Sequence, residues 1–200
     1  MPNDAQTIAA ALTEAAATLD AFIRDEVAMQ GVARFAEAAC ATVERGGTLL
    51  ACGNGGSMCD AMHFAEEWTG RFRRDRRALR AIALSDPATL TCIANDFGYD
   101  DVFARQIDAL AQPGDLLVAI STSGESANVL RAVAAAKPRN VLTVGLLGRG
   151  GGGVGAAVDI PIVVPLATTS DRIQEVHIKV LHIVIEAVER RLFPANYGGP

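Results

Sequence analysis

Histidine, carboxylate and amide side chains recur at helical spacing in two segments of the sequence. His63 and Glu67 are four residues apart, so on a helix they share one face. A second segment, RIQEVHIKVLHIV (residues 172–184), carries Gln174 and the other two of the three histidines, His177 and His182. These side chains suit zinc, and without a metal a carboxylate and an imidazole suit proton transfer next to a carbonyl.

The spacing of the second segment leaves the choice of the second histidine open. His177 and His182 lie about 140° apart on a helix, so one helix does not easily aim both at a single point. Gln174 lies about 60° from His177 and about 80° from His182, and its long side chain can assist either. Spacing alone slightly favours His177.

Two polar loops follow apolar runs and are typical of phosphate binding. GNGGS (residues 53–57) lacks the third glycine of a dinucleotide loop and the lysine of a nucleotide loop, and it equally suits a tight turn capped by Ser57. STSGES (residues 121–126) places hydroxyls at a helix start, where backbone N–H groups and the helix dipole favour anions. A cap needs one hydroxyl, whereas this loop has four, which favours a monophosphate: Ser121, Thr122, Ser123 and Ser126.

The elements that must position these residues are predicted by apolar runs alternating with helical patterns. Residues 3 to about 45 indicate two helices, the second closed by Gly46 and Gly47. Helical patterns also cover 57–70, 126–136 and about 171–192. Apolar runs predict buried strands at 48–53, 78–84, 115–121, 140–147 and 158–165. This alternation predicts one α/β domain with a parallel sheet covered by helices.

Composition restricts the class of protein further. A net charge of −5 and a pI near 5.2 provide no basic footprint for nucleic acid. We expect a soluble, cytoplasmic protein, because no basic leader, long apolar stretch or paired cysteine spacing is visible. RFRRDRR (residues 71–77) is a local exception, interpreted as a solvated segment or as the lining of an anionic pocket. GRGGGGVGA (residues 148–156) is expected to be a mobile loop.

Four blocks together resemble the sugar isomerase (SIS) domain family over nearly the whole chain. They are CGNGGSMCDAMHFAEEWTGRF, AIALSDPATLTCIANDFGYDDVFARQ, GDLLVAISTSGESANVL and DRIQEVHIKVLHIVI. The resemblance implies a single SIS domain (residues 1–200): a flavodoxin-like αβα sandwich with a mainly five-stranded parallel sheet (47–193) and N-terminal helices for oligomer packing (1–46). It also implies a cytoplasmic homotetramer with active sites at subunit interfaces.

Within that family the sequence looks like the members that isomerise sedoheptulose 7-phosphate to D-glycero-D-manno-heptose 7-phosphate through a cis-enediol. That reaction starts the supply of ADP- and GDP-heptose for bacterial lipopolysaccharide and related polymers. Glu67 is then the implied general base and His182 the general acid, which leaves His177 structural. One zinc ion per subunit is implied, with His63, Glu67, Gln174 and His182 as ligands. The implied substrate contacts are Asn54, Gly55, Gly56, Ser57, Glu67, Asn95, Asp96, Ser121, Thr122, Ser123, Ser126 and Gln174.

Two other functions remain open at this stage. One bacterial relative of these isomerases binds the replication initiator protein without catalysis, and RRLFPANYGGP (residues 190–200) faintly resembles its tail. That relative lacks the acid–base pair, which this chain has in Glu67 and His182. The other is an SIS isomerase for a different sugar phosphate, such as an amino-sugar phosphate. Glu125 stands where many members have asparagine, and its charge suits a phosphate site only if it points outward.

Overall fold

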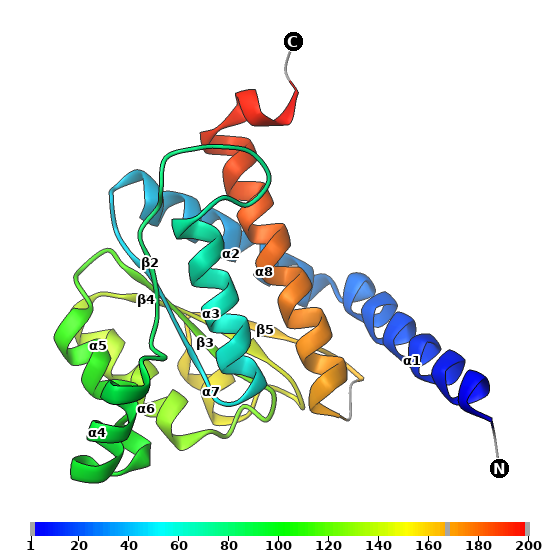
Figure 1. The fold of residues 1–200 in the computed structure, drawn as a ribbon, viewed down its shortest axis with the longest axis horizontal. Helices are drawn as coiled ribbons and strands as arrows, with labels where there is room; N and C mark the ends of the chain where they lie inside the picture. Colours follow the sequence, from blue (N-terminus) through cyan, green and yellow to red (C-terminus); the bar gives the residue numbers. More distant parts are fainter. Residues whose placement is uncertain (1–2, 167–168, 199–200) are drawn as a thin grey trace.

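The computed structural model describes residues 3–166 and 169–198, which fold into three layers (Figure 1). These residues form a sheet of five parallel strands in the order β2-β1-β3-β4-β5. Each strand lies within a run predicted from the sequence, which confirms the fold class. The strands are β1 (Leu49–Gly53), β2 (Ala81–Ala83), β3 (Leu116–Ser121), β4 (Leu142–Leu147) and β5 (Ile160–Val163).

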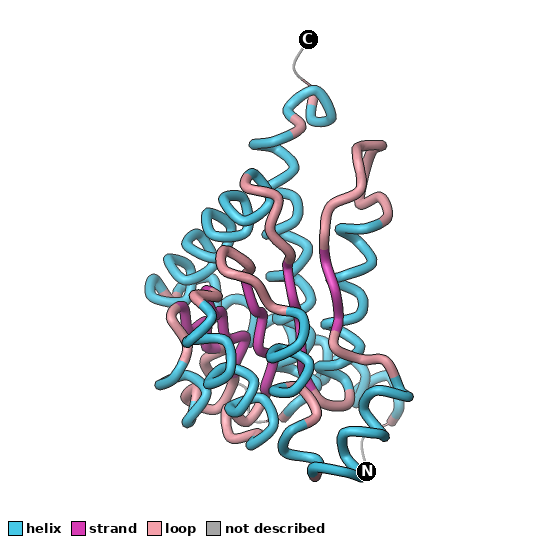
Figure 2. Tube along the Cα trace, turned by 90° about the vertical axis from the view of Figure 1, so that its left-hand side faces the viewer, coloured by secondary structure: helices cyan, strands magenta, loops and turns pink. Residues whose placement is uncertain are grey.

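Helices cover both faces of the sheet, so the central strands are buried on both sides (Figure 2). One face packs against α2 (Glu26–Glu44), α3 (Gly56–Thr69) and α8 (Ser170–Leu192). The other packs against α4 (Pro87–Phe97), α5 (Ala104–Leu110), α6 (Ala127–Ala136) and α7 (Gly152–Ala157). Successive residues of a strand enter alternate cores, as Leu49 and Leu50 do. This explains why the strands are apolar at nearly every position.

The first helix, α1 (Asp4–Arg24), extends away from the body of the molecule (Figure 1). Asn3 caps it by accepting a hydrogen bond from the backbone of Gln6, and Asp25 caps α2 in the same way. Gly46 follows α2 with a φ of 78°, as the predicted glycine closure requires. Short 3-10 turns cover Tyr99–Asp101, Lys137–Arg139 and Pro194–Tyr197. No helix of the described residues is long and apolar enough to cross a membrane.

One prediction about the fold is wrong. Residues 148–156 were expected to form a mobile loop, but the second half of this segment belongs to α7. Two contacts with the STSGES loop order it: Val154 N–H donates to the Gly124 carbonyl at 2.9 Å, and Gly153 N–H donates to Glu125 Oε1 at 3.0 Å. The glycines that suggest a loop allow this close approach, because Gly151 and Gly152 have positive φ angles of 88° and 53°.

Candidate active site

The two polar loops lie side by side at the carboxyl edge of the sheet. GNGGS follows β1 and STSGES follows β3, which are neighbouring strands whose register pairs Gly53 with Ile120. In a parallel sheet of order 2-1-3-4-5 the order of successive strands switches sides between β1 and β3, and ligands bind in the crevice at this switch point. The topology therefore brings both predicted phosphate loops to one ligand site.

The hydroxyls of the second loop gather around Ser121, at the end of β3. Ser121 Oγ lies 3.1 Å from Ser126 Oγ and 3.4 Å from Ser123 Oγ, and it accepts a hydrogen bond from Gly124 N–H at 3.1 Å. Thr122 Oγ1 donates instead to Ser170 Oγ at 3.2 Å, at the start of α8. The loop thus presents a cluster of hydroxyls at the N-terminus of α6, where the helix dipole favours an anion.

The Glu125 carboxylate is turned toward α7 by the hydrogen bond from Gly153 N–H. An acidic residue beside a phosphate loop repels phosphate unless it faces elsewhere, and here the backbone of α7 occupies one of its oxygens. The sequence could not show this, because the partner lies 28 residues away in a glycine-rich segment.

The first loop leads into α3 without a side-chain cap. Gly55 is the N-cap with a φ of 54°, and within the described residues no side chain bonds to the free N–H groups of this end. The interpretation of Ser57 as a cap is therefore wrong. Its buried hydroxyl instead accepts from Gln174 Nε2 at 3.5 Å, a contact at the limit of a hydrogen bond. The Gln174 side chain also lies against Gly56, where a Cβ atom would meet it at 2.7 Å.

Helices α3 and α8 lie side by side and bring His63, Glu67 and His182 together (Figure 1). The Nε2 atoms of His63 and His182 are 2.7 Å apart, and His63 Nε2 is 3.5 Å from Glu67 Oε1. One ligand atom from each of the three residues lies within 4.8 Å of the others. Two imidazoles and a carboxylate are the donor set of a common type of catalytic zinc site, so the chemistry of these residues fits zinc.

The surroundings of Glu67 and His182 disfavour the charged forms of these two side chains. Burial, followed by the nearby Glu66 charge, raises the pKa of Glu67, while His63 opposes the shift. Burial, followed by the charge of His63, lowers the pKa of His182. A carboxyl with a raised pKa is closer to the optimum of a general base near neutral pH, and a neutral imidazole can donate a hydrogen bond, accept a proton or bind a metal.

His177 lies on another face of α8, fully buried against the sheet. Its Nε2 atom is 3.2 Å from the carbonyl oxygen of Leu147 in β4, and burial lowers its pKa to about 4. The slight preference that spacing gave to His177 is thus wrong for the cluster, since His182 is the histidine that meets His63.

Asn95 and Asp96 lie exposed on α4 and hydrogen-bond to each other at 2.7 Å. Among the contacts of the described residues, none joins either of them to the histidine–glutamate cluster. Gln174 precedes His182 by eight residues, about 12 Å along a helix. Its contacts place it at the start of α3, beside the glycine-rich loop.

Several residues of the site were missed by sequence reasoning. Asn128 pairs with Asn54 through two amide hydrogen bonds of 2.8 and 2.9 Å, and the Tyr99 hydroxyl donates to Asn54 at 2.9 Å. Both contacts orient the first loop from elements distant in sequence. Asp60 lies one turn before His63, its buried Oδ2 has no partner among the described residues, and burial raises its pKa to about 6. Its helical spacing from His63 was the available signal.

The arginine-rich segment divides into exposed and buried members. Arg71, Arg73, Arg74 and Arg77 are exposed, as a solvated segment would be. That interpretation is wrong for Arg76, whose side chain is fully buried in an ion pair with Glu189.

Comparison with known proteins finds relatives similar to this chain in sequence and in fold. Residues 12–148, more than half of the chain, match the family model described as "SIS domain". The phosphoheptose isomerase of Fusobacterium nucleatum is 49% identical over 176 residues, which are 88% of this chain and 90% of that protein. Two solved structures of phosphoheptose isomerases are also similar. The one from Neisseria gonorrhoeae has a TM-score of 0.86 and 39% identity, covering 94% of this chain and 99% of that one. The one from Francisella tularensis has a TM-score of 0.89 and 30% identity, covering 94% and 100%.

Proposed function

Because the chain belongs to the phosphoheptose isomerases of the SIS domain family, we propose that it converts sedoheptulose 7-phosphate to D-glycero-D-manno-heptose 7-phosphate. The observation that carries the proposal is the meeting of His63, Glu67 and His182 on α3 and α8. Helix α3 begins in the GNGGS loop, and α8 begins at Ser170, which accepts a hydrogen bond from Thr122 of the hydroxyl-rich loop. A sugar phosphate needs both features, one for its phosphate and one for its carbonyl end.

In the proposed reaction Glu67 is the base and His182 the acid. Glu67 removes a proton from C1 of the ketose while His182 gives a proton to the C2 oxygen, which leaves a cis-enediol. Glu67 then returns its proton to C2, and His182 takes the proton from the C1 hydroxyl to leave the aldehyde. The short distances of both side chains from His63 support a single site in which the two can act on one substrate.

A zinc ion held by His63, Glu67 and His182 would polarise the carbonyl as a Lewis acid. We retain Gln174 as a proposed fourth ligand and as a substrate contact. Its contacts with Gly56 and Ser57 support the substrate role more directly.

The substrate phosphate is proposed to bind the hydroxyls of Ser121, Thr122, Ser123 and Ser126. The N–H groups of Gly55 and Gly56, with Asn54, are proposed to contact the sugar, because the start of α3 carries no side-chain cap. Asn95 and Asp96 remain proposed contacts on the neighbouring α4. Ser57, the last residue of the GNGGS loop, is buried in contact with Gln174.

A homotetramer is part of the proposal, with a subunit interface next to the active site. Exposed apolar side chains line α1, including Ile8, Leu12 and Ile23. An apolar groove between α1, α2 and α8 reaches His182 itself, and its lining includes Phe22, Met29, Val180 and Ile183. Apolar surface of this kind marks an interface. Ile183→Glu is expected to reduce the oligomer in light scattering, whereas Leu110→Glu, exposed on α5, leaves it unchanged.

We place the enzyme in the cytoplasm, at the start of the supply of activated heptoses for envelope polysaccharides. Cys40, Cys52, Cys59 and Cys92 are free thiols, which suits a reducing compartment.

The test is conversion of sedoheptulose 7-phosphate by the purified protein, followed by NMR, with a chelator and then with added zinc. Heptose 7-phosphate that disappears with the chelator and returns with zinc is the expected result. Turnover that ignores the chelator would remove zinc from the proposal but keep the isomerase. Absence of turnover in every condition would contradict the isomerase and favour non-catalytic binding.

A matched substitution tests the assigned base. Glu67→Gln keeps the size of the side chain and removes its basicity, so turnover should fall about 10²- to 10⁴-fold. Circular dichroism and light scattering should show the fold and the oligomer unchanged. A Glu67→Gln enzyme with full activity would show that another group moves the proton.

A further inference from the structure

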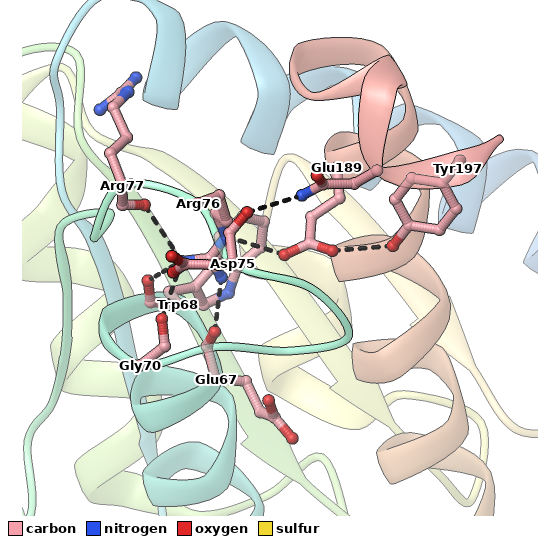
Figure 3. A network of polar contacts seen from close by, with 9 residues as sticks. Glu67, Trp68, Gly70, Asp75, Arg76, Arg77, Glu189 and Tyr197 are labelled. Carbon is pink, nitrogen blue, oxygen red and sulfur yellow. Dashed lines mark hydrogen bonds and ion pairs between the residues drawn. The ribbon is translucent and has the colours of Figure 1, made fainter. Parts of the chain in front are cut away.

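Arg76 lies in a buried network that the proposed mechanism does not use (Figure 3). Its side chain and that of Glu189 are both 0% exposed, and Arg76 Nε donates to Glu189 Oε1 at 2.8 Å. The neighbouring Arg77 side chain points away from the network, as Figure 3 shows. The Arg76 side chain is therefore buried because of its own contacts, and not because the whole arginine-rich segment is buried.

The Arg76 guanidinium closes the C-terminal end of α3. Nη2 donates to the Glu67 carbonyl at 2.6 Å, and Nη1 donates to the Trp68 and Gly70 carbonyls at 2.8 and 3.1 Å. The last carbonyls of a helix have no partner within it, and a positive charge near them is stabilised by the negative end of the helix dipole. One residue thus fixes the backbone of the turn that carries the Glu67 side chain.

The other side of the network belongs to α8. Glu189 follows His182 by seven residues, so the two side chains lie on nearly the same face of the helix, about 20° apart. The path from the Glu67 carbonyl through Arg76 to Glu189 consequently joins the two helices that bring His63, Glu67 and His182 together.

The C-terminal turn completes the network. The Tyr197 hydroxyl donates to Glu189 Oε2 at 2.7 Å, and Asn196 Nδ2 donates to the Asp75 carbonyl at 3.0 Å. Burial and this hydrogen bond raise the pKa of Tyr197 to about 12, so the hydroxyl stays a donor at neutral pH. Two residues of the segment that faintly resembles the tail of a binding protein, Asn196 and Tyr197, thus have partners within their own chain.

We propose that Arg76 is a positioning residue of the active site, which holds the Glu67 carboxylate against His63 and His182 by tying the last turn of α3 to Glu189. The proposal rests on the isomerase function proposed above. A misplacement of about 1 Å can cost about 100-fold in rate, so such a link affects chemistry as well as folding. The hydroxyls of the STSGES loop lie from the last residue of β3 to the N-cap of α6, and Arg76 has no contact with them among those of the described residues. Loss of Arg76 should therefore lower kcat and leave KM unchanged.

The experiment compares Arg76→Met, Arg76→Lys and the control Arg77→Met in the zinc-loaded full-length protein. Circular dichroism and light scattering first establish that each variant is folded at the assay temperature. Arg76→Met should lower kcat about 10- to 100-fold with KM unchanged, and it should weaken zinc binding in a competition titration. Arg76→Lys should recover part of the kcat, because lysine keeps the charge without the planar fork. Arg77→Met should match the wild type.

The outcomes separate this inference from the proposed function. An inactive wild type contradicts the isomerase itself. An active wild type with a folded Arg76→Met variant of unchanged kcat and zinc affinity overturns the positioning role. Equal losses in Arg76→Met and Arg77→Met also overturn it, because they would trace the effect to the charge of the loop. If Arg76→Met does not fold, Tyr197→Phe removes only the outer hydroxyl, and a smaller fall in kcat at constant KM is then required.

Discussion

Two faces of α8 carry histidines in opposite environments. His177 is fully buried against the sheet, with the carbonyl of Leu147 as its partner at 3.2 Å. His182 is partly exposed, faces α3, and lies 2.7 Å from His63. The two residues are five positions apart in one helix, so neither residue type nor helical structure distinguishes them.

The difference shows that the environment of each face of α8, and not the residue type, determines whether its histidine is available for chemistry. Burial is the main cause of a lowered pKa at both histidines, but at His182 the nearby charges of His63 and Arg73 contribute as well. His177 is enclosed by the core, where a proton costs folding free energy. His182 is partly exposed and borders the groove between α1, α2 and α8, so the core does not enclose its imidazole.

The same substitution at the two histidines is expected to have opposite consequences. His182→Asn should lower kcat about 10²- to 10⁴-fold, because it removes the proposed acid, while the unfolding free energy changes little. The matched His177→Asn variant should keep kcat among its folded molecules. Both are measured with the NMR assay and urea denaturation at one protein concentration. If His177→Asn lost turnover while folded and His182→Asn kept it, the roles would be reversed.

A second prediction concerns acid. In the unfolded chain His177 has its ordinary pKa of about 6.5, whereas burial lowers its pKa to about 4 in the folded protein. Between these values the unfolded state binds more protons, so stability falls as pH falls, by about 3 kcal/mol in total. Urea unfolding from pH 7 to pH 4 measures this loss.

His177→Leu supplies the control for the acid experiment. It removes the titrating group and keeps an apolar side chain of similar size, so the loss of stability between these pH values should shrink. An undiminished loss in this variant would assign the acid sensitivity to other groups.

A third prediction separates residues of the chemical step from residues that only bind substrate. Ser123→Ala removes one hydroxyl from the loop proposed to hold phosphate. A hydrogen bond to a charged group contributes about 1.5 to 3 kcal/mol, so KM should rise about 10-fold or more with kcat nearly constant. A fall in kcat at constant KM would instead place Ser123 in the chemical step. Steady-state kinetics at several substrate concentrations distinguish the two.

The positions of the strands and of the long helices followed from the sequence. Strands buried on both faces are apolar at nearly every residue, so β1, β3 and β4 are visible as short runs bounded by turns. The hydroxyls from Ser121 to Ser126 also stood out locally, because their clustering exceeds what a helix cap needs. The prediction of a mobile loop at residues 148–156 was wrong, because contacts with Gly124 and Glu125 order the second half of this segment.

Periodicity and loop chemistry thus determined which elements exist and which residues are chemically capable. Tertiary structure alone decided which histidine of α8 meets His63 and which arginine of residues 71–77 is buried with Glu189. The physical reason is range. Secondary structure depends on neighbours a few residues away, whereas these pairs join residues 119 and 113 positions apart in the chain. Only the packing of α3 against α8 brings such residues within hydrogen-bonding distance.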